Sequence, residues 1–140
     1  MARPVPVPDA LTAPYWEAAS QHVLTAAQCS QCSAFAHPPD DVCRSCGTLD
    51  PGFAYVPVRG RGVIRSWTVV RRPLVPGFDD VAPFTLVDVE LDEDPGLRVV
   101  GRLLRSGDGA PAPIGAAVAV AFEDIAPGVA IPAFTLAGAP

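Results

Sequence analysis

The chain has 140 residues, of which 49% are hydrophobic, and carries a formal net charge of −5. Its length suits one domain with a small appendage, and its apolar fraction is large enough to bury a core. The acidic balance opposes binding to phosphate backbones, so we expect no nucleic-acid partner. The longest apolar stretch, 114–122, is too short to cross a bilayer, and residues 1–10 lack the apolar run of a signal peptide. The sequence therefore predicts a cytoplasmic protein without membrane contact.

The N-terminal segment is rich in proline over residues 1–8, and we expect it to be disordered or held only by a partner. A short helix follows, in which Thr12 caps the first turn and Pro14 is tolerated. Four residues would share one face of this helix at helical spacing: Tyr15, Trp16, Ala19 and Val23. That face either packs on the same chain or anchors a partner, because aromatic residues are typical of interface cores.

The cysteines follow the pattern C-x₂-C-x₁₀-C-x₂-C, formed by Cys29, Cys32, Cys43 and Cys46. Each C-x-x-C pair can wrap a tight turn around one ion, and four thiolates suit tetrahedral Zn²⁺. Disulfides or a redox role are the alternatives, but reduced cytosolic conditions favour the metal. Four protein ligands leave no position for water, so the zinc is predicted to be structural. His37 lies between the pairs and is interpreted as a loop residue.

From Phe53 onward the hydrophobic pattern changes to a period of two, which predicts strands. Their expected positions are 63–70, 87–91, 97–104, 117–122 and 129–134. Pro132 would make the last of them an edge strand.

The predicted fold is mostly β: an N-terminal helix and a zinc ribbon followed by a five-stranded OB-fold Greek-key barrel. A β-sandwich is the competing architecture. We expect an N-terminal segment and helix at 1–25, the zinc ribbon at 26–52 and the OB-fold domain at 53–140.

No catalytic constellation is evident in the sequence. Neither His22 nor His37 sits in a recognisable base motif, and no cysteine is left over to act as a nucleophile. The acidic residues at 79–80 and 90–94 are interpreted as solvated turns, and no glycine-rich phosphate loop follows a strand. We therefore expect no catalytic residue and no turnover by this chain alone.

Six stretches carry a resemblance to a known family: YWEAASQHVL (15–24), CSQCSAFAHPPDDVCRSCG (29–47), GRGVIRSWTVVRRPLVPGFDD (60–80), PFTLVDVELDE (83–93), IGAAVAVAFED (114–124) and GVAIPAF (128–134). On these stretches the chain resembles the DUF35 proteins, which combine a zinc ribbon with an OB-fold and associate with acyl-CoA enzymes. Ser33 departs from the family pattern, which usually has glycine after the first cysteine pair.

The resemblance implies a non-catalytic accessory subunit that forms a hetero-oligomer with a thiolase-fold enzyme. Family members complete a thiolase-like aldolase that shortens the side chain of a steroid-type CoA thioester, or bridge a thiolase to a second CoA enzyme. Similar domains are fused to MaoC-like hydratases. A MaoC-like partner and a CoA thioester at the shared interface are therefore further expectations.

A nucleic-acid-binding module is the alternative function, because zinc ribbons and OB-folds both often bind nucleic acids. Trp67 and Phe84 could stack on bases. The densest basic set could contact nucleic acid, CoA phosphates or an acidic partner, or could be ordinary solvated side chains. It consists of Arg59, Arg61, Arg65, Arg71 and Arg72.

The expected face for partner or substrate contact combines the N-terminal helix with the loop at 71–78. Aromatic and arginine side chains dominate the binding energy of interfaces. The candidate contact residues are Tyr15, Trp16, Trp67, Arg71, Arg72 and Phe78.

Overall fold

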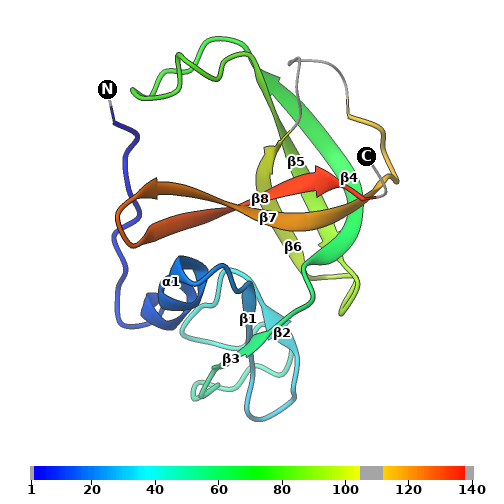
Figure 1. The fold of residues 1–140 in the computed structure, drawn as a ribbon. Helices are drawn as coiled ribbons and strands as arrows, with labels where there is room; N and C mark the ends of the chain where they lie inside the picture. The colour runs from blue at the N-terminus through cyan, green and yellow to red at the C-terminus, as the bar shows by residue number, and fades with distance from the viewer. Residues whose placement is uncertain (1, 105–111, 138–140) are drawn as a thin grey trace.

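The computed structural model describes residues 2–104 and 112–137. In this part of the chain the strands form a three-stranded sheet and a closed five-stranded barrel, and one short helix, α1, packs between them (Figure 1). The predicted mostly β fold with an OB-type barrel is confirmed, and a β-sandwich is excluded. No helix in the described ranges has the length and apolar character that a membrane crossing needs.

Helix α1 spans Ala13–Ser20 and packs against β8 of the barrel and β1 of the small sheet. Tyr15 and Ala19 are buried and Trp16 is half-buried, as a shared helical face requires. Val23 does not extend that face, because the helix ends at Ser20 and His22 adopts a positive φ of 61°.

The start of α1 also differs from the expectation. Thr12 makes no side-chain cap on the helix. Instead, the Asp9 carboxylate accepts hydrogen bonds of 2.8 Å from both the backbone N–H and the hydroxyl of Thr12. Asp9, which sequence analysis did not single out, therefore organises the turn that leads into the helix.

The small sheet has strand order β2-β1-β3, and both pairings are antiparallel. Its strands are β1 (Thr25–Gln28), β2 (Phe35–Ala36) and β3 (Ala54–Pro57). β3, which falls within the predicted domain at 53–140, pairs with β1 along its whole length, and the barrel strands begin at Arg61.

The barrel contains five strands: β4 (Arg61–Val70), β5 (Phe84–Leu91), β6 (Arg98–Leu103), β7 (Ala117–Ala126) and β8 (Val129–Leu136). Their order is β4-β5-β6-β8-β7, and pairing of β7 with β4 closes the barrel. The β6–β8 pair is parallel and the other pairs are antiparallel. This crossover is what an OB-type Greek key requires.

The core fills the barrel interior with the alternating apolar side chains of these strands. Val87, Val89 and Leu91 on β5 are buried, while the intervening Asp88 and Glu90 are only partly covered. Asp88 and Glu90 pair outside with arginines, at 2.6 Å from Arg98 and 3.4 Å from Arg65. The period of two therefore separates the core from a charged outer face, as predicted.

Pro132 does not mark an edge strand, contrary to the sequence-based expectation. Strand β8 lies between β6 and β7 and pairs with both. The parallel ladder with β6 begins at Ala133, so the missing N–H of Pro132 falls just before it. Strand β8 can therefore contain Pro132 inside a closed barrel, because its ladder with β6 is short.

The N-terminal segment is held by the chain itself, not left free as predicted. The Arg3 side chain donates hydrogen bonds to the Gly77 carbonyl at 3.2 Å and to Glu123 at 3.3 Å. Its guanidinium also lies 4.9 Å from the centre of the Phe78 ring, a cation–π distance. These contacts fix the segment along the side of the barrel (Figure 1).

The G-x-G pair at the start of β4 has a steric explanation. Gly60 has a φ of +72°, and a β-carbon there would lie 2.2 Å from a methyl carbon of Val120. At Gly62 a β-carbon would lie 2.1 Å from the Glu90 carbonyl oxygen. The two glycines thus let β4 approach β7 and β5 closely where the barrel closes.

Gly60→Ala is expected to destabilise the fold more than Gly128→Ala. Both glycines have nearly the same φ, +72° and +71°, so both variants incur a backbone strain of about 1–2 kcal/mol. Only Gly60 also meets Val120, and such overpacking adds roughly 1–3 kcal/mol. Urea unfolding of the two variants measures the difference in their free energies of unfolding. Equal losses would show that Val120 moves aside without cost and would contradict the prediction.

Candidate functional site

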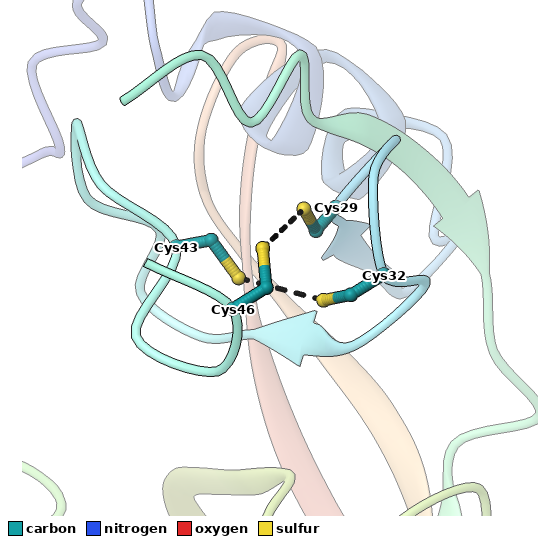
Figure 2. Close-up of side chains that lie close together, drawn as sticks. All are labelled: Cys29, Cys32, Cys43 and Cys46. Carbon is teal, nitrogen blue, oxygen red and sulfur yellow. Dashed lines mark hydrogen bonds between the residues drawn. The ribbon is translucent and has the colours of Figure 1, made fainter. Parts of the chain in front are cut away.

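Two turns bring the four cysteines to one point, as Figure 2 shows. Cys29 and Cys32 follow the end of β1, and Cys43 and Cys46 come from the segment between β2 and β3. All four sulfur atoms lie within 4.8 Å of one another. The distance from Cys29 Sγ to Cys46 Sγ is 3.9 Å, and that from Cys32 Sγ to Cys43 Sγ is 3.6 Å.

These distances fit a tetrahedral zinc centre. With Zn–S bonds of about 2.3 Å, tetrahedral geometry separates neighbouring sulfurs by about 3.8 Å, and the two recorded distances lie on either side of this value. A disulfide would need about 2.05 Å, and all four cysteines are free. The set matches structural Zn²⁺ and not the disulfide alternative.

The two cysteine turns have the same backbone form. The N–H of Ser33 donates to the Cys29 carbonyl at 2.9 Å, and the N–H of Gly47 donates to the Cys43 carbonyl at 2.8 Å. Both Ser33 and Gly47 adopt positive φ, 65° and 77°. Ser33 thus accepts the left-handed conformation at a cost of about 1–2 kcal/mol, and the departure from glycine leaves the turn intact.

The backbone around Cys43 favours the thiolate form. The N–H groups of Cys46 and, to a smaller extent, Ser45 stabilise the charged sulfur and lower the pKa of Cys43 to about 6, although burial opposes the shift. A thiolate is the form that binds metal. The backbone of this turn therefore favours the form of Cys43 that binds metal.

The second feature is an apolar cleft of about 520 Å³ at the junction of the two units. Its lining residues come from α1, the 37–39 segment, β3, the 78–86 region and the strands β6, β7 and β8. The aromatic side chains that line it are Tyr15, Trp16, Tyr55, Phe78 and Phe84. Several are in mutual contact, with ring centres 4.9 Å apart for Tyr15–Trp16 and 5.7 Å for Phe78–Phe84.

One side of the cleft carries a charged group of residues. Arg102 and Glu123 line the cleft and form an ion pair, and Arg3 approaches Glu123 from the N-terminal segment. Burial alone would raise the pKa of Glu123, but the hydrogen bond from Arg102 and the charge of both arginines outweigh it and lower the pKa. Glu123 is therefore ionised at neutral pH, and its stabilising contribution is lost only as acid protonates it.

His37 also lines the cleft, which sequence analysis missed. Its ring centre lies 5.4 Å from that of Tyr15, and burial lowers the pKa of His37 from its ordinary value. The imidazole is therefore neutral at pH 7. Its position between metal ligands gave no indication of the direction in which the side chain would point.

The predicted contact residues fall into two groups. Tyr15, Trp16 and Phe78 come together in the cleft, although Tyr15 is 7% exposed and belongs to the core. The remaining three do not line the cleft: Trp67 is 39% exposed on β4, and Arg71 and Arg72 are exposed just beyond its end.

Comparison with known proteins places both units in one family. Residues 16–51 match the model described as the ChsH2 rubredoxin-like zinc ribbon domain, and residues 55–123 match that of the ChsH2 C-terminal OB-fold domain. A solved chain described as "Ltp2-ChsH2(DUF35) aldolase" is 30% identical, with a TM-score of 0.80 over 94% of this chain and 98% of that one. The chain belongs to the DUF35 family. This confirms the resemblance and the assignment of the four cysteines to structural zinc.

Two curated relatives of this DUF35 protein match it over part of their length, and the first of them is much longer than this chain. A "Probable enoyl-CoA hydratase alpha subunit" from Thermomonospora curvata is 34% identical over 102 residues, which are 73% of this chain and 30% of that protein. A "DUF35 domain-containing scaffold protein" from Methanothermobacter thermautotrophicus is 32% identical over 84 residues, 58% of each chain. The chain thus spans less than a third of the first relative and somewhat more than half of the second.

Purified, reduced protein is expected to contain about one Zn²⁺ per chain. Cys43→Ser should abolish stoichiometric zinc and lower the unfolding temperature, because binding free energy at such a centre is folding free energy. Ser45→Ala, in the same turn, keeps all four thiolates and serves as the control. Metal analysis with thermal unfolding checks both, and wild-type protein without zinc would disprove the assignment.

Proposed function

We propose that this DUF35 protein is a non-catalytic accessory subunit that binds a thiolase-fold enzyme and completes it for carbon–carbon bond chemistry on an acyl-CoA. The proposal is carried by the likeness to the Ltp2-ChsH2(DUF35) aldolase chain over nearly the whole of both chains. The description of that chain as an aldolase leads us to favour retro-aldol cleavage. The resemblance to DUF35 proteins leads us to favour a steroid-type side-chain CoA thioester as the substrate.

A non-catalytic role agrees with the surroundings of the nucleophiles and bases in the described residues. The cysteines converge on one another at the metal centre. His22 pairs with Asp124 at 2.8 Å and stacks on Phe122 at an exposed site, while His37 lies against Tyr15. None of these arrangements sets a nucleophile beside a base, so the partner would supply the catalytic groups.

The loop after β4 supports a role in partner binding. Leu74 is 98% exposed and Val75 is 48% exposed, and both follow the exposed Arg71 and Arg72. Exposed apolar side chains beside arginines are typical of interfaces. We place the partner contact on this loop together with Trp67, and the two arginines also suit the phosphates of a CoA thioester.

A second partner is included in the proposal. One relative is named as a probable enoyl-CoA hydratase alpha subunit, which agrees with a MaoC-like hydratase acting beside the thiolase-fold enzyme. The accessory chain would then hold two successive activities on the same acyl-CoA.

The first test compares a purified thiolase-like partner with and without this chain on acyl-CoA substrates of different bulk. The chain alone is expected to give no turnover, while its addition should raise partner turnover at least tenfold for bulky substrates, because a covered site positions substrate and excludes water. Equal activity, stability and preference in both samples would contradict the completing role.

The second test concerns the contact loop. Leu74→Asp and Arg72→Ala are each expected to weaken partner binding by about 2 kcal/mol, the usual loss at a central contact. Leu49→Asp is the matched control, because Leu49 is 83% exposed but lies in the zinc ribbon. Calorimetric titration measures the affinities, and unchanged binding by both loop variants would move the interface elsewhere.

The nucleic-acid alternative loses two of its supporting features. Phe84 is 8% exposed and packs against Phe78, so its face is not free to stack on a base. Arg65 is engaged by Glu90 at 3.4 Å. Strong, salt-sensitive retention on heparin would nevertheless favour this alternative over the acyl-CoA role.

A further inference from the structure

The cleft between α1, the zinc ribbon and the barrel is partly open to solvent and holds about 520 Å³. Small-molecule sites occupy roughly 300–1,000 Å³ and favour junctions between domains. A cavity of about 150 Å³ accommodates a single benzene ring, so this one suits a ligand with several rings or a long branched chain.

The walls are fixed by contacts that do not depend on a ligand. The Tyr55 hydroxyl donates a hydrogen bond to the Leu11 carbonyl, which ties β3 of the ribbon to the turn before α1. Pro38 and Pro39 form part of the wall and have restricted backbones. A preformed apolar site binds without a large ordering cost.

The polar groups are few and are placed for orientation. Neutral His37 offers a donor and an acceptor at the ribbon side. On the barrel side, Arg102 lines the cleft, and its buried Nε has no hydrogen-bond partner within the described residues. An apolar body carrying a hydroxyl or carbonyl oxygen matches this distribution, because buried donors are normally satisfied.

We propose that the cleft binds the bulky apolar acyl group of the partner's CoA-thioester substrate. The accessory chain then contributes a substrate pocket as well as a cover, and selects substrates by the size of the acyl group. The nature of this ligand rests on the proposed function, while the cleft itself does not.

Binding can be measured on the full chain with tryptophan fluorescence. The chain has two tryptophans, so Trp67→Phe leaves Trp16, in the cleft wall, as the sole reporter. Cholate, a hydroxylated four-ring carboxylate, serves as the bulky probe, and decanoate as the linear one. We expect a saturable change with cholate and at least tenfold weaker binding of decanoate. No saturable change with cholate, or equal binding of the two, would overturn the proposal.

Two matched variants separate the cleft from the general surface. Val100 lines the cleft and is 61% exposed, whereas Ile114 is 60% exposed and does not line it. Val100→Glu is expected to weaken cholate binding at least tenfold and Ile114→Glu less than twofold. Equal affinities would overturn the assignment. Amide chemical shifts of the unmodified chain provide a measurement that needs no variant: cholate should shift the amide signals of His37 and of residues 99–102, and shifts confined elsewhere would also overturn it.

The same variants distinguish this inference from the proposed function in the partner assay. Val100→Glu should retain stimulation on a short acyl-CoA and lose it on a bulky one. Full stimulation on both substrates would refute the pocket and leave the accessory role standing. If cholate binds as expected but the unmodified chain leaves its partner unchanged, the accessory role fails and the cleft remains a site for bulky apolar acids.

Discussion

The convergence of four thiolates on one metal ion is the constraint on which the N-terminal half depends. The small sheet has a strand of two residues and two strands of four, which bury too little apolar surface to hold the long connections between them. A tetrathiolate centre supplies the missing stability, because the ion binds only when both cysteine turns are formed. The 37–39 segment lies between those turns, so the metal also fixes one wall of the cleft.

The junction between ribbon and barrel follows from that arrangement. β1 pairs on one side with β2 and on the other with β3, which leads directly into the barrel. The chain therefore leaves the ribbon sheet only a few residues before β4 begins, and α1 fills part of the angle between the units. The part of this angle that α1 does not fill is the cleft, and its walls include five aromatic rings together with Pro38, Pro39 and Pro132.

The sequence predicted those features that depend on local spacing. The cysteine pattern specified the metal ligands, and alternation at Val87, Val89 and Leu91 identified a strand with one buried face. It did not predict features decided by contacts distant along the chain. Pro132 was interpreted as the mark of an edge strand, because the strands on either side of β8 cannot be identified from the residues of β8 itself. The pairing of β3 with Thr25–Gln28 was not predicted, because it joins segments about thirty residues apart in the chain. Likewise, the helical spacing of Tyr15 and Trp16 gave their shared face but not the cleft on which it opens.

The Arg3 contacts have a practical consequence for anyone extending the chain. The side chain of Arg3 is 14% exposed and is held by the acidic group of Glu123 and the carbonyl of Gly77, so its backbone has little freedom to turn. A β-carbon at Gly77 would lie 2.6 Å from the Arg3 nitrogen, which shows how closely the two segments run. An affinity tag or fused domain joined at the amino end would thus emerge beside the loop that follows β4. Such a tag or domain could obstruct partner binding at that loop, so it should be removed before partner affinities are compared.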